Sequence, residues 1–140
     1  MSLRADNITQ ITKTPDIFSD FFTNFSKHPV TKELARLRND QSIKQSVRNL
    51  ILTNYGERLF QPGIGSNIYR SLFEPNDVIA AEDIKYHIET TVRQNEPRVN
   101  LLQVDVFSNQ EKDSVTINVV FAILSTNQIQ SLDVVLRRVR

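Results

Sequence analysis

Residues 81–107, AEDIKYHIETTVRQNEPRVNLLQVDVF, decide the fold of this chain. The apolar residues of the first part recur at steps of four: Ile84, Ile88 and Val92. This spacing predicts an amphipathic helix over 81–95 with one buried face. In the second part the apolar residues recur at steps of two: Leu102, Val104 and Val106. The change of period predicts that a strand over 99–107 follows the helix.

The tripeptide Glu96-Pro97-Arg98 separates these two elements. Pro97 biases Glu96 out of the α region and removes a backbone donor, so we expect the helix to end near Asn95. Arg98 can then present its planar guanidinium to a carboxylate or a backbone carbonyl. Two interpretations are open: a helix-ending turn with a solvated ion pair, or a rigid pair of charges that meets a partner.

The rest of the chain predicts two further helices and two further strands. A helix over 42–53, capped by Asp40 or Ser42, carries the apolar stripe Ile43, Val47, Leu50 and Ile51. A short helix over 67–73 places three residues inward: Ile68, Leu72 and Phe73. Strands over 114–124 and 131–140 alternate with period two. Their inward residues are Val115, Ile117, Val119, Phe121 and Ile123 in the first and Leu132, Val134 and Leu136 in the second.

Helices followed by strands predict a small α+β domain, with a mainly antiparallel three-stranded sheet and helices on one face. An N-terminal arm precedes it. We expect residues 1–30 to form an extended arm that becomes ordered only on assembly, and residues 31–140 to form the domain. The segment 17–38 is ambiguous, because its phenylalanines have helical spacing while His28-Pro29 interrupts a helix.

All three glycines lie in the segment 56–65, GERLFQPGIG. The order of a phosphate-binding P-loop is absent, because no Lys follows the glycines at the start of a helix. We therefore expect a compact structural loop, with Gly56 in a left-handed position after the helix. Its structural residues are Gly56, Glu57, Arg58, Pro62, Gly63 and Gly65.

The last predicted strand ends in a basic cluster, Arg137, Arg138 and Arg140. One interpretation is an edge strand protected by charge against aggregation. The other is a strand that pairs with a partner chain and is steered to it by charge.

Composition excludes several classes of function. The chain has 140 residues, a net charge of +1 and no cysteine, so nothing indicates nucleic-acid binding, a disulfide or a cysteine zinc site. No apolar run is long enough to span a membrane, and the N-terminus lacks the apolar region of a signal peptide. His28 and His87 form no metal-ligand motif, and we expect no cofactor, metal or small-molecule substrate. Carboxylates such as Glu57, Glu74 and Glu96 could supply the acid pair of a glycosidase, a weak signal in a chain with 16 acidic residues.

The order of the motifs resembles a known family. Residues 43–51, IKQSVRNLI, lead to Gly56-Glu57-Arg58, then to Pro62 and Gly65, and finally to Glu96-Pro97-Arg98 before the strands. Over about 40–140 this pattern is similar to the baseplate wedge family of contractile phage tails, typified by the gene-twenty-five wedge subunit of T-even phage. The TssE subunit of type VI secretion baseplates belongs to the same family.

The resemblance implies a non-enzymatic structural role in the virion tail baseplate, which is assembled in the host cytoplasm. Glu96, Pro97 and Arg98 would contact the helical core bundle of the wedge. The three-stranded sheet would template the first ring of sheath subunits by sharing β-strands, with multiple copies in a ring. Two alternatives remain open: a peptidoglycan-cleaving, lysozyme-like glycosidase of the baseplate, and an adaptor that binds one extended peptide.

Overall fold

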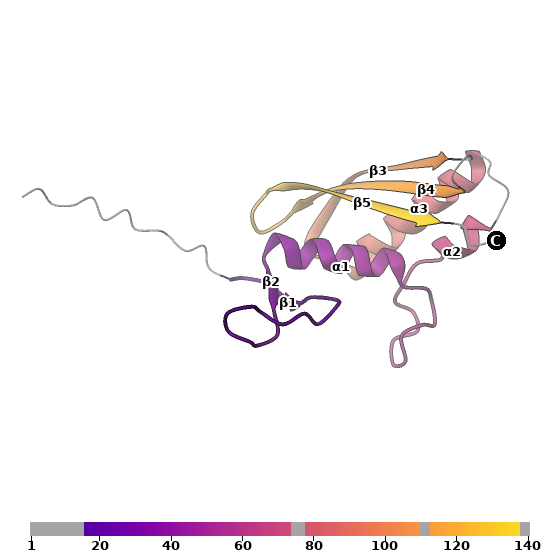
Figure 1. The fold of residues 1–140 in the computed structure, drawn as a ribbon. Helices are drawn as coiled ribbons and strands as arrows, with labels where there is room; N and C mark the ends of the chain where they lie inside the picture. Colours follow the sequence, from indigo (N-terminus) through magenta and orange to yellow (C-terminus); the bar gives the residue numbers. More distant parts are fainter. Residues whose placement is uncertain (1–15, 74–77, 110–112, 138–140) are drawn as a thin grey trace, which may run out of the picture.

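The computed structural model describes residues 16–73, 78–109 and 113–137 (Figure 1). Two short strands come first, then three helices, then three longer strands. Their bounds are β1 Ser19–Phe21, β2 Arg36–Arg38, α1 Asp40–Leu52, α2 Ile68–Leu72, α3 Val78–Asn95, β3 Val99–Asn109, β4 Ser114–Ile123 and β5 Ile129–Arg137. The predicted α+β class, with helices before an antiparallel sheet, is confirmed. None of the helices in the described ranges is long and apolar enough to cross a membrane.

The three longer strands form one antiparallel sheet in the order β3-β4-β5. In its middle, Val104 of β3 lies opposite Val119 of β4, which lies opposite Leu132 of β5. A bulge after Leu101 breaks the alternation of β3. Leu102 therefore does not share the buried face with Val104, and its side chain is 51% exposed.

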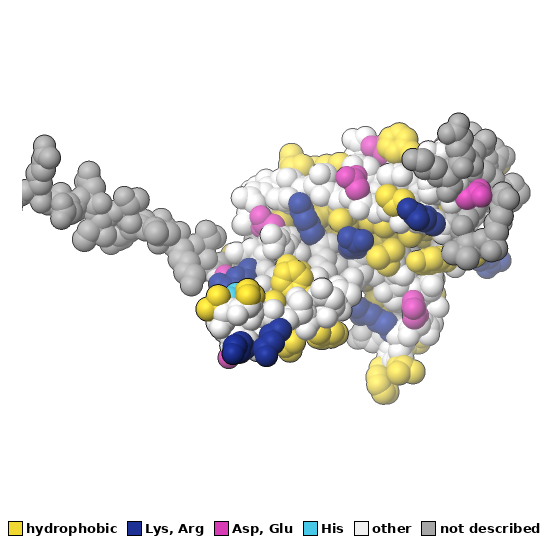
Figure 2. All heavy atoms as spheres, viewed as in Figure 1, with side chains coloured by type: hydrophobic (Ala, Val, Ile, Leu, Met, Phe, Trp, Pro, Cys, Tyr) yellow, Lys and Arg dark blue, Asp and Glu magenta, His cyan; other side chains and the backbone are white. Residues whose placement is uncertain are grey.

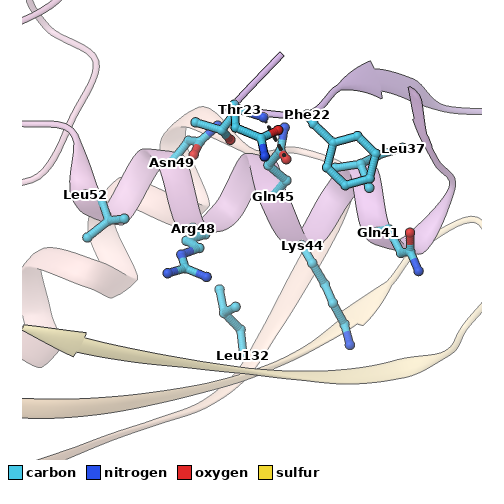
Figure 3. Close-up of a pocket in the computed structure, with 11 residues that line it drawn as sticks. Phe22, Thr23, Leu37, Gln41, Lys44, Gln45, Arg48, Asn49, Leu52 and Leu132 are labelled. Carbon is cyan, nitrogen blue, oxygen red and sulfur yellow. Dashed lines mark hydrogen bonds between the residues drawn. The ribbon is translucent and has the colours of Figure 1, made fainter. Parts of the chain in front are cut away.

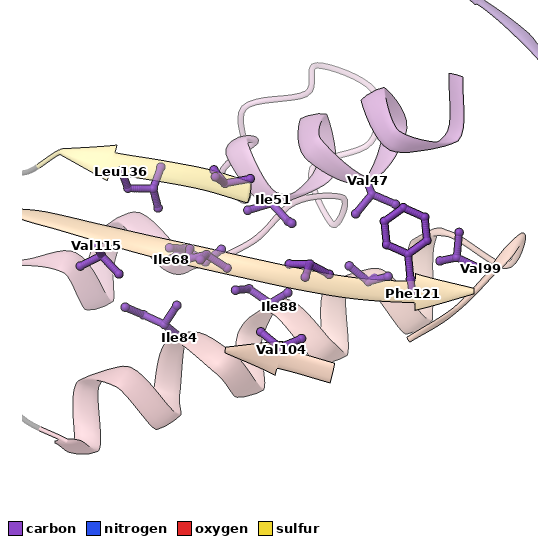
Figure 4. Packing of buried hydrophobic residues seen from close by; sticks show 14 of the residues in the cluster. Val47, Ile51, Ile68, Ile84, Ile88, Val99, Val104, Val115, Phe121 and Leu136 are labelled. Atoms are coloured by element: carbon purple, nitrogen blue, oxygen red, sulfur yellow. The ribbon is translucent and has the colours of Figure 1, made fainter. Parts of the chain in front are cut away.

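One hydrophobic core joins the inner face of this sheet to the helices (Figure 4). The predicted inward residues of β4, from Val115 to Ile123, are all buried. The stripes of α1 and α3 meet them, since Val47, Ile51 and Ile88 belong to the same cluster. Both helices thus cover one face of the sheet and leave the other uncovered within the described ranges.

The ends of α1 differ from the prediction. Neither Asp40 nor Ser42 is the N-cap: Asp40 is already the first helical residue, Ser42 is buried, and Asn39 holds the cap position. The Asn39 side-chain oxygen accepts a hydrogen bond from the backbone N–H of Ile17 at 3.0 Å. Gly56 adopts the expected left-handed φ of 84°, but the helix has ended earlier, with Thr53 extended.

The ambiguous segment 17–38 contains a small hairpin, in which β1 pairs antiparallel with β2 and Lys27 bridges to Leu34. The hairpin spans the expected boundary between arm and domain at residue 30, and that division stays a prediction. Phe18 packs against the core, whereas Phe21 and Phe25 are exposed. Residues 1–15 lie outside the described ranges.

The short helix α2 confirms Ile68 and Leu72 as buried residues. Phe73 was expected inward and is 72% exposed, so that prediction is wrong. The helix ends at Leu72 and Phe73 is its C-cap, so the helical spacing no longer directs the ring to the core.

Candidate partner-binding site

The turn Glu96-Pro97-Arg98 connects the end of α3 to the start of β3. The Glu96 N–H donates the last helical hydrogen bond, to the carbonyl of Val92 at 2.9 Å. Beyond Pro97, the Arg98 carbonyl accepts a bond from the N–H of Leu124 at 3.0 Å, just past the end of β4. The turn is therefore held by a helix on one side and by the sheet on the other.

Glu96 and Arg98 form a bidentate ion pair. Arg98 Nε lies 2.5 Å from Oε1 of Glu96, and Nη2 lies 2.6 Å from Oε2. Ser46 of α1 donates a third hydrogen bond to Oε2 at 2.6 Å. Glu96 is only 3% exposed, whereas the Arg98 side chain is one-third exposed and lies over the ring of Phe18. The carboxylate is thus inside the fold, and the guanidinium extends towards the surface.

The environment of the pair lowers the pKa of Glu96. Burial alone would raise it, but the hydrogen bonds from Arg98 and Ser46 and the positive charge of Arg98 more than reverse that effect. The hydrogen bond to Glu96 raises the pKa of Arg98, against the opposing effect of burial. Both groups are therefore held in their charged forms.

A cleft of about 340 Å³ lies beside the turn. The loop after α1 contributes Arg58 and Ile64 to its wall, and the hairpin contributes Asp20. The structure thus brings Arg58, predicted as a structural loop residue, next to Glu96, Pro97 and Arg98. Sequence reasoning missed Ser46 and Phe18 as partners of the pair. Ser46 lies at the edge of the apolar stripe of α1. That position alone gives little indication that its hydroxyl binds a buried carboxylate.

The loop over 56–65 is tied together by its own backbone and by one carboxylate. The Gly56 N–H donates to the carbonyl of Pro62 at 2.9 Å. Oε2 of Glu57 accepts a bond from the N–H of Asn54 at 2.9 Å. Gly65 packs so closely that an added Cβ would lie 2.7 Å from the carbonyl oxygen of Thr53. These contacts hold the loop together, and the structural role of its residues stays a prediction.

The far end of this loop carries the most exposed apolar side chains of the described chain. Phe60 is 100% exposed and Leu59 nearly so. Figure 2 shows hydrophobic side chains at this protruding end. Gly63 is exposed, and a Cβ added there would meet no atom within 4 Å, so close packing does not require a glycine at this position.

Arg137, the described member of the basic C-terminal cluster, lies far from the turn. Arg137 ends β5 opposite Ser114, at the start of β4, while Val99 beside the turn pairs with Ile123 at its end. About nine strand residues separate the two places, or roughly 30 Å. The structure therefore does not bring Arg137 next to the turn. Arg138 and Arg140 lie outside the described residues.

No group of three or more potential metal ligands occurs within residues 16–73, 78–109 and 113–137. His87 is partly exposed on α3, and its Nε2 lies 3.7 Å from Oδ2 of Asp83. Two of the carboxylates considered for a glycosidase pair have partners within the fold. Glu57 accepts a hydrogen bond from the N–H of Asn54, and Glu96 is bound by Arg98. Glu74 lies outside the described ranges.

Comparison with known proteins decides the family. The family profile described as "Baseplate wedge protein gp25" matches residues 37–128, two-thirds of the chain. The chain belongs to this family of baseplate wedge proteins. The match includes the loop over 56–65 and the turn Glu96-Pro97-Arg98, and it ends before Arg137. This wedge protein is also 30% identical, over 93 residues, to baseplate wedge protein gp25 of Enterobacteria phage T4, covering 66% of this chain and 70% of the relative.

Solved structures support the fold of this wedge protein. A protein of Geobacter sulfurreducens, named as a candidate tail lysozyme, aligns with a TM-score of 0.69 at 23% identity, over 74% of this chain and 96% of that one. A chain of the anti-feeding prophage baseplate aligns with a TM-score of 0.61 at 19% identity, over 84% of this chain and 83% of that one. At these identities the likeness concerns the fold alone.

Proposed function

We propose that this baseplate wedge protein binds the helical core bundle of the wedge through Glu96, Pro97 and Arg98. The bidentate pair carries the proposal, because it fixes the guanidinium of Arg98 before any partner arrives. A preorganised side chain loses little conformational entropy on binding. Pro97 is exposed beside it, and the cleft next to the turn leaves room for a partner side chain.

Arg98 has donors to spare for this contact. A guanidinium carries five N–H donors in a fixed fork, and the bonds to Glu96 use Nε and Nη2. Nη1 donates to no group within the described ranges. A carbonyl at the end of a partner helix, or a carboxylate on it, would suit this donor.

We further propose that the sheet templates the first sheath ring by strand sharing, in particles assembled in the host cytoplasm. Within the described part of the chain β5 pairs only with β4, so its other edge offers unpaired backbone groups. An incoming strand would satisfy these groups in a fixed register. Several copies in a ring would make individually weak strand additions strong together.

The proposed role is structural and not enzymatic. A glycosidase acid needs a raised pKa in order to stay protonated near neutral pH. The surroundings of Glu96 act in the opposite direction and lower its pKa. Among the comparisons, the lysozyme alternative has the name of one structural relative at 23% identity in its favour.

Co-purification with the other wedge proteins tests the proposed contact. Arg98→Ala should reduce incorporation into the wedge, and Arg98→Lys should reduce it as well, because lysine keeps the charge but lacks the bidentate fork. Arg93→Ala, an exposed arginine in the last turn of α3, is the matched control and should incorporate normally. Normal incorporation of a folded Arg98→Ala protein would contradict the proposal.

A further inference from the structure

A groove of about 610 Å³ lies between α1 and β5 (Figure 3). Phe22 and Thr23, which follow β1, form part of its wall, and Leu132 projects into it from β5. The floor is apolar, since Leu37 is buried and Leu52 and Leu132 are half-buried against the core. The hydrophobic core is thus incompletely covered along the groove between α1 and β5.

The wall of the groove is fixed before anything binds. Gln45 of α1 donates from Nε2 to the carbonyl of Phe21 at 2.6 Å, and its Oε1 accepts a bond from the N–H of Thr23 at 3.4 Å. These bonds attach the hairpin to α1, so the groove beside β5 is already formed in the folded protein without a bound partner.

The groove carries uncompensated positive charge. Lys44 and Arg48 are the charged residues among its eleven lining residues, and none of the eleven is acidic. Both side chains extend from α1 towards β5 (Figure 3). Within the described ranges neither forms an ion pair. Figure 2 shows basic side chains over the region between α1 and β5, so the charge is open to the surface.

The spacing of the two cations matches that of an extended chain. Four residues of helix rise about 6 Å, which separates Lys44 from Arg48 along α1. Side chains at i and i+2 of a strand point to the same side, about 6.7 Å apart. Since α1 and β5 run alongside each other in the same direction, a strand added to β5 would lie along this row (Figures 1 and 3).

We propose that the groove binds an extended acidic segment of a partner, with two carboxylates at i and i+2 meeting Lys44 and Arg48. The backbone of the segment would pair with the edge of β5 that is unpaired within the described ranges, and an apolar neighbour on the same side would cover Leu132. The inference rests on the proposed strand sharing at β5. It adds that the shared strand is acidic, with two carboxylates on one side.

The experiment is an NMR titration of the full chain with three peptides, each acetylated and amidated. The first is Ser-Val-Thr-Glu-Val-Glu-Val-Thr-Ser, with both glutamates on one side. The second, Ser-Val-Thr-Glu-Glu-Val-Val-Thr-Ser, has the same composition but places its glutamates on opposite sides. The third carries glutamine in place of both glutamates of the first. The first should bind most tightly, shift the amide resonances of 129–137, and slow their hydrogen exchange.

Variants of the two cations should weaken this binding. Lys44→Gln combined with Arg48→Gln removes the two proposed ion pairs with the peptide, and the first peptide should then bind about 2- to 30-fold more weakly. The matched control combines Lys85→Gln with Arg93→Gln, which removes the same charge from exposed positions on α3 and should leave binding unchanged. Thermal melts of both double variants verify that they are folded.

Three results would overturn the inference: no binding of the first peptide, equal binding of all three peptides, or unchanged binding by the Lys44 and Arg48 variant. Such a failure is separate from failure of the proposed function. The core-bundle contact and the strand sharing are measured on assembled wedges and baseplates, with variants at Arg98 and at the end of β5.

Discussion

Arg98 and Glu96 form an ion pair across Pro97 in which one partner is buried and the other reaches the surface. Two hydrogen bonds of 2.5 and 2.6 Å join them, and Glu96 is 3% exposed. Loss of Arg98 would leave Glu96 buried with the hydroxyl of Ser46 as its remaining side-chain partner. The same arginine therefore serves the fold and, in our proposal, the interface.

The first prediction concerns stability. Arg98→Ala should lower the free energy of unfolding by about 1–3 kcal/mol, below the usual cost of breaking a fully buried pair because Arg98 is partly solvated. Combining it with Glu96→Gln should cost less than the sum of the single changes, since the amide carries no unpaired charge. Urea denaturation of the four proteins measures this coupling. Additive effects would show that the pair is energetically irrelevant.

The second prediction concerns pH. The pKa of Glu96 in the fold lies below its ordinary value of 4.5, so the folded state favours the charged carboxylate more than the unfolded chain does. Its contribution to stability is then fully present above about pH 4.5 and is lost as the pH falls through the lower folded-state pKa. The stability difference between wild type and Glu96→Gln should narrow below pH 4.5 in denaturation experiments. A difference that stays constant down to pH 3 would contradict the pKa shift.

Local patterns predicted the main elements because their information lies within a few residues. The steps of four at Ile84, Ile88 and Val92 and the alternation from Val115 to Ile123 were sufficient for α3 and β4. The exposure of Leu102, two residues before the buried Val104, could not be predicted, because a bulge depends on the pairing of two strands, which no single strand encodes.

The candidate site was predictable in part. Pro97 between two opposite charges indicated a rigid turn, and the structure has one. Its other components come from distant segments: Ser46 lies 50 residues before Glu96, and Phe18 belongs to the ambiguous segment before α1. Contacts of this kind arise only when the core brings α1, α3 and the hairpin together.

The third prediction tests the close packing at Gly65. This residue has a φ of 147°, and an added Cβ would lie 2.7 Å from the carbonyl oxygen of Thr53. Gly65→Ala should therefore destabilise the protein by about 1–3 kcal/mol. Gly63→Ala is the matched control, because its added Cβ meets nothing within 4 Å, and its effect should stay within about 0.5 kcal/mol. Thermal unfolding compares the two, and equal melting temperatures would refute the packing argument.

The fourth prediction separates a structural role from a hydrolytic one. Purified protein should not clear peptidoglycan in a lysis-zone assay, and neither Glu57→Gln nor Glu96→Gln should alter that result. Oε2 of Glu57 already holds the N–H of Asn54, and Glu96 is kept ionised by Arg98. Lytic activity of wild type that either substitution abolishes would favour the glycosidase alternative.

The fifth prediction concerns the basic end of β5. If Arg137, Arg138 and Arg140 steer an acidic sheath strand to the edge of the sheet, their replacement by glutamine should slow sheath growth on purified baseplates. The protein itself should remain folded, because Arg137 is exposed at the last pair of β5, opposite Ser114.

The salt dependence of this effect identifies its cause. Raising the salt from about 0.1 to 1 M shortens the screening length from about 10 to 3 Å, so wild type should lose its advantage over the triple variant. The control replaces Arg70, Lys85 and Arg93, three exposed cations on α2 and α3, and should initiate sheath at the wild-type rate in both salts. Sheath tubes that grow at the normal rate from baseplates carrying the triple variant at 0.1 M salt would falsify charge steering at this edge. In that case β5 would promote sheath growth through backbone pairing alone, because glutamine substitutions keep every N–H and C=O of its edge in place.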